Sequence, residues 1–410
     1  MTNYESLPLG ELGKIVTGKT PKTENPENFG TDYMFIGPTD LHKHFFITSS
    51  ERMISAKGLE SIKGSALNGV SVLVGCIGWD MGNVGVVEGK CATNQQINSI
   101  TNIHGKYNPL YIYYWLKTKK DFLYQQASVT RTPILNKTDF SSIRINLPKE
   151  RNYQDKVVGL LAAIDKKVEL NNRINAELEA MAKTLYDYWF VQFDFPDANG
   201  KPYKTSGGKM VYNQTLKREI PEGWSDVSLV DIATFTNGIA CQKYYPNGDE
   251  PIYKVIKIRE FSSGFDNTSE SVHQGVPEKV VVNDGDILFS WSATLEVQLW
   301  TGGTGALNQH IFKVTSDSYP KTFYFFEVLK YLEHFKMVAE LRKTTMGHIT
   351  KDHLVTSRIS LPPIDLIQAM DEKLSPIISN IVSNNQQNRE LAELRDWLLP
   401  MLMNGQVTVK

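Results

Sequence analysis

The sequence predicts an α+β protein made of two duplicated globular modules, with two long helices that pair as an antiparallel coiled coil. Three observations support this prediction. Five short segments recur in the same order in both halves, each copy alternates β-branched runs with turn residues, and a long apolar series follows each copy. A chain of 410 residues is long enough for two to four domains, because domains usually have about 100–200 residues.

The duplication rests on the order of its matches. Any one match is weak, but five in one order indicate an internal repeat with a period of about half the chain, which excludes a short-repeat solenoid. The matched segments are Leu7–Gly18 with Val227–Gly238, Phe35–Leu41 with Val255–Phe261, Asn68–Val74 with Asp284–Phe289, Asn94–Ile97 with Asn308–Ile311, and Ile143–Pro148 with Ser357–Pro363.

Each module is expected to be an α+β globule, over residues 1–150 and 224–363. Short β-branched and aromatic runs separated by Gly, Asn and Pro predict strands and turns. One helical stretch interrupts each copy, at Pro109–Gln126 and at Pro320–Lys343. Residues 193–223 are rich in Pro, Gly, Asp and Asn, which predicts a linker of turns rather than helix or β-ladder.

A different periodicity follows each module, over residues 151–192 and 364–405. Apolar residues recur there at alternating steps of four and three, the pattern of a coiled-coil seam. One alternative is that each helix lies only on its own module. Matching polar interruptions instead favour pairing of the two helices, and buried Asn in a coiled coil sets register and partner. These seam asparagines are Asn171, Asn175, Asn384 and Asn388.

Composition places the chain among ordinary folded proteins, with 41% hydrophobic and 22% charged residues. The longest nearly apolar run, Val70–Trp79, is far shorter than the ~20 residues needed to span a bilayer. Three scattered cysteines (Cys76, Cys91 and Cys241) favour a reducing, cytoplasmic location over a disulfide framework or a zinc site. The net charge of −1 counts against a protein that binds nucleic acid unaided, whose affinity usually comes from a basic surface.

Three patterns resemble catalytic or metal-binding motifs, and none has the surroundings that its chemistry needs. Gly13–Thr20 matches the phosphate-binding loop, but the proline-rich residues that follow cannot form the required helix. Asn108–Tyr111 lacks the second proline of the Asn-Pro-Pro-Tyr loop of amino-methyltransferases. His42 and His44 have no third ligand at a convincing spacing. We therefore expect no catalytic residue, metal site or cofactor on this chain.

Two modules held apart by a rigid spacer suit a bipartite DNA target, whose halves lie on one face of the duplex about one turn apart. Basic side chains in the loops would mostly position phosphates, whereas glutamine, asparagine and arginine would read base edges. For each lysine the alternative is a solvated surface charge. Trp79 and Trp291 are assigned to matching places after a strand, where they either pack in the core or stack on a base. The candidate DNA contacts are Lys19, Thr20, Lys22, Arg131, Thr132 and Lys137 in the first module, and Gln242, Lys243, Tyr244, Lys343, Thr344, His348 and Lys351 in the second.

The central run Trp189–Pro196, followed by Gly200–Tyr203 and Glu219–Trp224, is the most distinctive part of the sequence. Leu229–Ile232 opens the second module, and Leu398–Gly405 follows the last helix. With these segments and the duplication, nearly the whole chain resembles the specificity subunits of type I restriction–modification systems.

The resemblance implies a non-catalytic subunit with two target recognition domains, each reading one half of a split double-stranded DNA sequence. It also implies that the paired helices set the gap between the halves and dock two methyltransferase subunits. Two restriction subunits would complete an ATP-driven translocase and endonuclease. S-adenosylmethionine, ATP and Mg²⁺ would then bind to the partner subunits. The recognition domains vary within such a family, so the candidate DNA contacts rest on composition and loop position alone.

Two other classes of protein are alternatives. A fused methyltransferase or nucleoside triphosphatase would need a catalytic domain, for which two modules and two helices leave no room. An adaptor whose modules bind proteins would show no sequence preference for duplex DNA.

Overall fold

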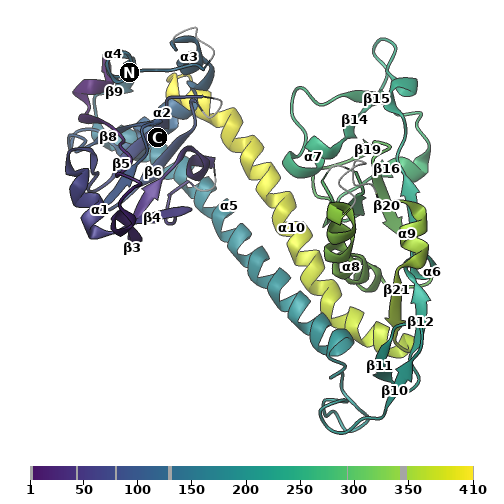
Figure 1. Cartoon of the computed structure of the whole chain (residues 1–410). Helices are drawn as coiled ribbons and strands as arrows, with labels where there is room; N and C mark the ends of the chain where they lie inside the picture. The colour runs from purple at the N-terminus through teal and green to yellow at the C-terminus, as the bar shows by residue number, and fades with distance from the viewer. Residues whose placement is uncertain are drawn as a thin grey trace. The chain divides into compact units, whose positions relative to one another are not determined.

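The computed structural model describes residues 3–42, 45–78, 81–127, 132–292, 294–341 and 349–409 (Figure 1). The chain divides into two compact units, of which unit 1 contains Met1–Glu169 with Leu391–Lys410 and unit 2 contains Leu170–Glu390. Two long helices, α5 (Arg151–Tyr186) and α10 (Ile364–Met403), contribute residues to both units.

The first module, in unit 1, is built on two sheets. Its larger sheet has the antiparallel order β2-β8-β5-β6, and its smaller sheet has the order β4-β3-β7, in which β3 and β7 run parallel. A separate ladder pairs β1 with β9, which leads directly into α5. The elements are β1 (Tyr4–Pro8), β2 (Lys14–Thr17), β3 (Phe29–Ile36), β4 (Arg52–Ile54), α1 (Ala56–Ser61), β5 (Ser71–Gly75), β6 (Val84–Val87), β7 (Cys91–Thr93), β8 (Ile97–Thr101), α2 (Pro109–Lys117), α3 (Lys120–Gln125), α4 (Lys137–Ser142) and β9 (Arg144–Pro148).

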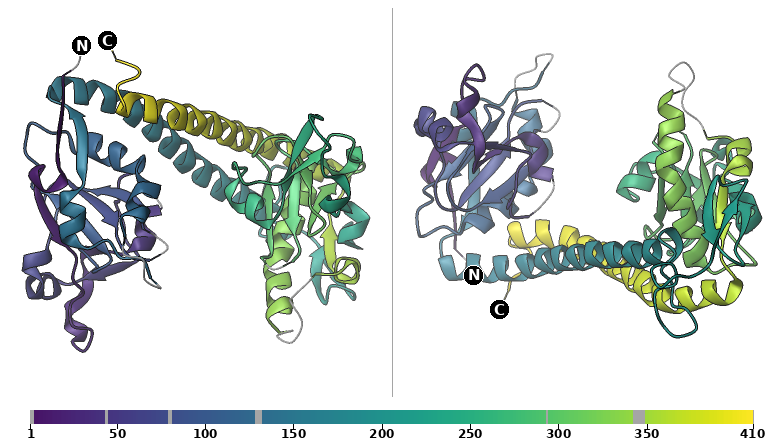
Figure 2. Two further views of the ribbon diagram at one scale, coloured as in Figure 1. Left: turned by 90° about the horizontal axis from the view of Figure 1, so that it is seen from above. Right: turned by 60° about the horizontal axis from the view of Figure 1, so that its bottom comes forward.

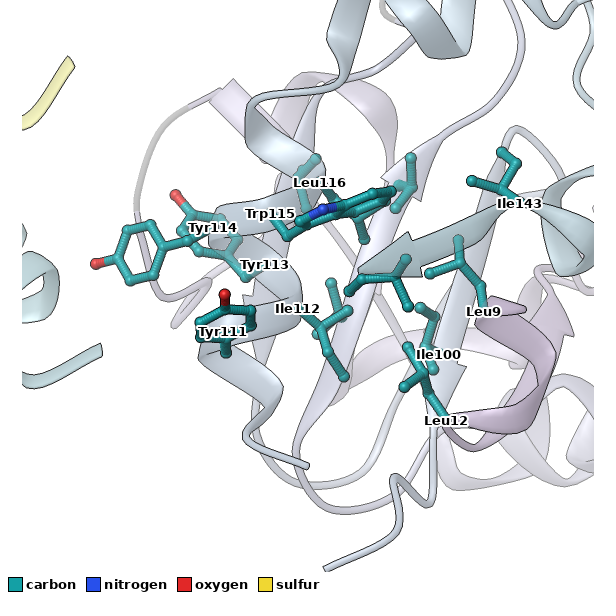
Figure 3. Packing of buried hydrophobic residues seen from close by; sticks show 14 of the residues in the cluster. Leu9, Leu12, Ile100, Tyr111, Ile112, Tyr113, Tyr114, Trp115, Leu116 and Ile143 are labelled. Atoms are coloured by element: carbon teal, nitrogen blue, oxygen red, sulfur yellow. The ribbon is translucent and has the colours of Figure 1, made fainter. Parts of the chain in front are cut away.

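Helix α2 supplies much of the core of the first module. Asn108 caps it by accepting a hydrogen bond from the Leu110 N–H, and Pro109 occupies its first turn, where no donor is needed. All residues from Tyr111 to Leu116 are buried. Figure 3 shows Ile112 on the side of the helix that faces Leu9, Leu12 and Ile100, and Tyr113 and Tyr114 on its other side. The predicted helix over Pro109–Gln126 is divided, because α2 ends at Lys117 and α3 begins at Lys120.

The second module, in unit 2, repeats this topology. Its larger sheet has the order β13-β20-β17-β18, its smaller sheet has the order β15-β14-β19-β16 with β14 and β19 parallel, and β12 pairs with β21. The predicted duplicated α+β fold is therefore confirmed. The elements are β12 (Ser225–Ser228), α6 (Leu229–Ile232), β13 (Thr234–Asn237), β14 (Ile252–Ile256), α7 (Ile258–Ser263), β15 (Ser271–His273), β16 (Val281–Val282), β17 (Ile287–Ser290), β18 (Glu296–Leu299), β19 (Gly305–Leu307), β20 (Ile311–Thr315), α8 (Lys321–Leu341), α9 (Lys351–Thr356) and β21 (Arg358–Leu361).

The ends of the long helices are part of the module cores. In unit 1, Leu161 of α5 and Leu402 of α10 are fully buried in the hydrophobic cluster of the first module. In unit 2, Tyr186 of α5 and Leu374 of α10 lie in the cluster of the second module, and the Tyr186 hydroxyl donates to a Glu327 carboxylate oxygen at 2.7 Å. Apolar residues of both long helices therefore pack against the modules as well as against the partner helix.

Hydrogen bonds in unit 2 show that α5 and α10 pair in antiparallel fashion (Figure 2). The side-chain amide of Asn171 donates to oxygens of Gln387 and Asn388 at 2.9 Å. One turn later, Asn175 donates to Asn385 and accepts from Asn384, both at 2.8 Å. Later residues of α5 thus pair with earlier residues of α10, so the two helices run in opposite directions.

Residues 193–223 form a folded piece of unit 2. Strands β10 (Met210–Asn213) and β11 (Arg218–Pro221) pair in an antiparallel hairpin, so the expectation of turns without a ladder is wrong. The ring of Phe195 stacks on the rings of Tyr203 and Trp224, with centroids 4.6 and 5.5 Å apart. These aromatic contacts anchor the segment on the module core, which composition alone does not reveal.

Candidate nucleic-acid interface

In the first module, two loops meet at one edge of the larger sheet. The Gly18 N–H donates to the Ile97 carbonyl at 3.0 Å, and the Lys19 N–H donates to the Thr93 carbonyl at 2.9 Å. These bonds hold the loop after β2 against the turn between β7 and β8. A Cβ atom on residue 18 would overlap the carbonyl oxygen of Asn94. Glycine is therefore required for this close approach of two backbones.

The second module builds the same edge. The Gly238 N–H donates to the Ile311 carbonyl at 3.2 Å, and the Ile239 N–H donates to the Leu307 carbonyl at 2.8 Å. A Cβ atom on residue 238 would overlap the Leu307 carbonyl oxygen. The same construction recurs because both copies keep a glycine after the strand and an Asn-Gln pair in the opposing turn.

Two further segments join this edge through matching hydrogen bonds. In the first module the Cys76 N–H donates to the Gln96 carbonyl at 2.7 Å, and the Leu135 N–H donates to the Cys76 carbonyl at 2.9 Å. In the second module the Trp291 N–H donates to the His310 carbonyl, and the Ile349 N–H donates to the Trp291 carbonyl at 3.1 Å. Four segments thus converge on one edge of each module.

These bonds correct the pairing of the two tryptophans. Trp291 occupies the place of Cys76, because both residues make the same two backbone hydrogen bonds. The assignment of Trp79 to that place is wrong, and Trp79 itself lies outside the described residues. Burial raises the pKa of the Cys76 thiol to about 11, so this cysteine is protonated at neutral pH and is not a nucleophile.

Several of the predicted DNA contacts lie on these edges. Lys19, Thr20 and Lys22 belong to the loop after β2, and the Thr20 hydroxyl donates to the Gln95 side-chain oxygen at 2.7 Å. Thr132 precedes the segment that contacts Cys76, and Lys137 opens α4, which Asn136 caps.

In the second module the described candidates follow Gly238. Gln242, Lys243 and Tyr244 form a short 3-10 turn, in which Tyr244 is half-buried and lies 5.6 Å from the ring of His273. Four other candidates lie outside the described residues, as does the side chain of Lys351, the first residue of α9: Arg131, Lys343, Thr344 and His348.

The turn between β7 and β8, with its counterpart between β19 and β20, was not among the candidate DNA contacts chosen from the sequence. Gln95 in the first module and Gln309 in the second are exposed at these edges. The Asn237 side-chain oxygen accepts a hydrogen bond from the Trp291 indole at 3.1 Å, and the ring of Trp291 lies 5.8 Å from that of His310. The repeat of Asn94–Ile97 as Asn308–Ile311 was the signal that could have identified this turn.

The two edges differ in one respect. In the second module a cavity of about 480 Å³ opens beside the edge, lined among the described residues by Phe235, Trp291, Phe312 and Leu354. In the first module Asn98 takes the place of Phe312, and its amide bridges Thr17 and the Leu135 carbonyl, at 2.6 and 3.3 Å. The same backbone therefore presents two chemically different surfaces.

The loop before β17 is tied to α10 within unit 2. Asp284 accepts hydrogen bonds from Arg389 at 3.0 Å and from Gln386 at 3.0 Å, and its side chain is 14% exposed. Burial alone would raise the pKa of Asp284, but the hydrogen bonds from Arg389, Gln386 and the Gly303 backbone lower it below its usual value. Asp284 is therefore a carboxylate at neutral pH that ties the loop before β17, at the end of the sheet opposite this edge, to α10.

A sequence model of the type I restriction–modification DNA specificity domain matches residues 1–180 and 221–393, far more than half of the chain. This chain belongs to that specificity family. Curated relatives agree: the specificity subunit is 26% identical to the type I restriction enzyme MjaIX specificity subunit of Methanocaldococcus jannaschii, over 100% of this chain and 94% of the relative. It is 23% identical to the HindI specificity subunit of Haemophilus influenzae, over 65% of this chain and 70% of the relative.

The fold also has a solved counterpart. The S subunit of a type I restriction–modification system from M. genitalium superposes on the specificity subunit with a TM-score of 0.60, covering 98% of this chain and 96% of that one. Its sequence identity of 11% shows likeness of fold alone. In the part of this chain that the structure describes, every helix is too short or too polar to cross a lipid bilayer.

Proposed function

We propose that this specificity subunit reads a bipartite double-stranded DNA target, with the first module reading one half and the second module the other. The observation that carries the proposal is the repeated edge, where four segments converge on the same backbone hydrogen bonds but present different side chains. A shared frame with different side chains suits two unlike half-sites. Phosphate contacts would come from Lys19, Lys22, Lys137 and Lys243, and base contacts from amide side chains.

In this proposal α5 and α10 set the gap between the half-sites and dock two methyltransferase subunits, and two restriction subunits complete the complex. Their chemistry needs S-adenosylmethionine, ATP and Mg²⁺, which we assign to the partners, with no cofactor or catalytic residue on this chain. The near-neutral net charge of −1 supports dependence on partners, because a freestanding DNA binder usually needs a basic surface. The complex would act in the cytoplasm, where chromosomal DNA is accessible.

The experiment that tests the proposal is purification of the subunit with its cognate methyltransferase, followed by mapping of methylated adenines in the host genome. A split motif that disappears when this chain is deleted supports the proposal. Methylation indifferent to the chain overturns it and favours an adaptor whose modules bind proteins.

Exchange of residues 1–150 for those of a relative tests whether the modules read independently. We expect one half-site to change while the other is retained. A change in both halves would contradict separate reading.

Matched deletions test the role of the helices as a spacer. Removal of whole helical turns between Gln154 and Phe190, with an equal deletion within residues 367–399, keeps the seam asparagines opposite one another. We expect an altered gap and unaltered half-sites, measured by the same methylation mapping. An altered half-site sequence would count against the spacer role.

A further inference from the structure

The turn between β7 and β8 and its counterpart between β19 and β20 carry glutamine at the same position. In both turns an asparagine side chain closes the backbone by accepting a hydrogen bond two residues on. Asn94 accepts from the Gln96 N–H at 3.0 Å, and Asn308 accepts from the His310 N–H at 3.4 Å. The Gln96 carbonyl also accepts from the Cys76 N–H, and the His310 carbonyl accepts from the Trp291 N–H. The backbone is therefore held on both sides of the glutamine that precedes each of these residues.

The other amides of these turns are engaged internally. In the first module the Asn94 amide nitrogen donates to the Gln96 side-chain oxygen at 2.9 Å. In the second module Asn308 is 8% exposed, and its amide nitrogen lies 3.7 Å from the sulfur of Cys241. Among the amide side chains of the two turns, those of Gln95 and Gln309 are the exposed ones.

Neighbouring side chains orient the two glutamines. The Thr20 hydroxyl donates to the Gln95 oxygen at 2.7 Å, which leaves that oxygen a second lone pair and leaves both amide hydrogens for another partner. The Gln309 amide nitrogen lies 3.4 Å from the His310 ring nitrogen Nε2. A side chain that is already oriented loses less rotamer freedom when it binds.

We infer that Gln95 and Gln309 are the equivalent specificity-determining residues of the two modules, each reading one base pair of its half-site and matching adenine. This inference rests on the proposed function. A glutamine amide donates to N7 and accepts from N6 of adenine in the major groove, whereas lysine only donates and mostly contacts phosphates. Lys19 and Lys22, on the loop beside Gln95, would position the duplex without selecting a base.

The test uses the full chain in complex with its methyltransferase. Gln95→Ala should lower discrimination at one position of one half-site by about 10-fold, and Gln309→Ala should do the same in the other half-site. Gln95→Glu should shift the preference at that position toward cytosine, whose amino group a carboxylate accepts. Binding to a panel of duplexes substituted one base pair at a time, with genome methylation mapping, measures both effects.

The matched control is Gln214→Ala in the β10–β11 turn, an exposed glutamine outside the segments that form the edges, which should leave the motif unchanged. A uniform loss of binding to every duplex would overturn the inference, because it marks a phosphate contact. An unchanged motif for both alanine variants would overturn it as well, and an altered motif for Gln242→Ala instead would move the role to the neighbouring loop. Absence of any split motif for the wild-type complex would instead be the failure of the proposed function.

Discussion

Arg395 of α10 forms an ion pair with Asp165 of α5 inside unit 1, with Nη1 2.9 Å from Oδ1. The Asp165 side chain is 5% exposed and that of Arg395 is 17% exposed. The other carboxylate oxygen accepts a hydrogen bond from the Tyr114 hydroxyl at 2.7 Å, so the pair links α2 of the first module to both long helices. Burial alone would lower the pKa of Arg395, but the hydrogen bond and charge of Asp165 raise it, so the guanidinium stays charged.

Removal of the arginine should destabilise unit 1. Arg395→Ala leaves the Asp165 carboxylate buried without its counter-charge, which should lower the free energy of unfolding by about 3 kcal/mol. Denaturation of the full chain in urea, followed by circular dichroism, measures the loss. An effect below about 0.5 kcal/mol would show that solvent reaches Asp165 and replaces the arginine.

The repeat supplies a control for that prediction. In unit 2, Ile378 stands six residues before Asn384, as Asp165 stands six residues before Asn171. Ala182 stands eleven residues after Asn171, as Arg395 stands eleven residues after Asn384, and both Ile378 and Ala182 are buried. Phe325 follows Pro320 at the same distance as Tyr114 follows Pro109. The triple variant Tyr114→Phe, Asp165→Ile, Arg395→Ala should therefore recover most of the lost stability, because it removes the whole buried polar group.

Acid should release the tie between Asp284 and α10. The pKa of Asp284 is lowered in the folded chain, so its contribution to stability is present above the unfolded value of about 4 and is lost as the pH falls through the folded value. We expect Asp284→Asn to lower the free energy of unfolding by about 1–2 kcal/mol at neutral pH. This difference from wild type should shrink below about pH 4. Urea denaturation at a series of pH values measures it; a difference independent of pH would contradict the assignment.

The seam asparagines should stabilise the helix pair through their mutual hydrogen bonds. Asn175→Leu removes the partner of both Asn384 and Asn385, which are half-buried, and should cost about 1 kcal/mol. Thermal unfolding of the full chain measures the change. Arg173→Leu, at an exposed position of the same helix, is the control and should have little effect; equal effects would show that the amide bonds add nothing.

The glycines at the two edges should control one half-site each. Gly18→Ala forces the turn at Asn94 away from the loop after β2, and Gly238→Ala does the same at Leu307. Each change should lower the free energy of unfolding by about 1–3 kcal/mol. It should reduce base discrimination only in the half-site of its own module. Gly105→Ala is the control, because a Cβ atom there meets no neighbour within 4 Å. Loss of both half-sites from one substitution would contradict independent edges.

The repeated fold was predictable from the sequence, whereas the contacts of individual loops were not. The matched segments predicted a duplicated α+β module, and the structure confirms the duplicated fold. The tryptophan pairing was wrong, because a sequence match in a loop does not specify which backbone groups it contacts. The hairpin at Met210–Pro221 was missed, since turn-forming residues are equally common in short ladders and in irregular linkers.

The sequence by itself determined the duplication and the helix pairing. Both follow from patterns of residues that are close in sequence, such as the apolar seam around Asn171 and Asn384. Only the tertiary structure decided which loop residues share an edge and which amides remain outward. That outcome depends on backbone hydrogen bonds between distant segments, as between Gly18 and Ile97, and on whether neighbours such as Gln96 already engage a side chain. No local pattern specifies those contacts, because they form only when the sheet brings the loops together.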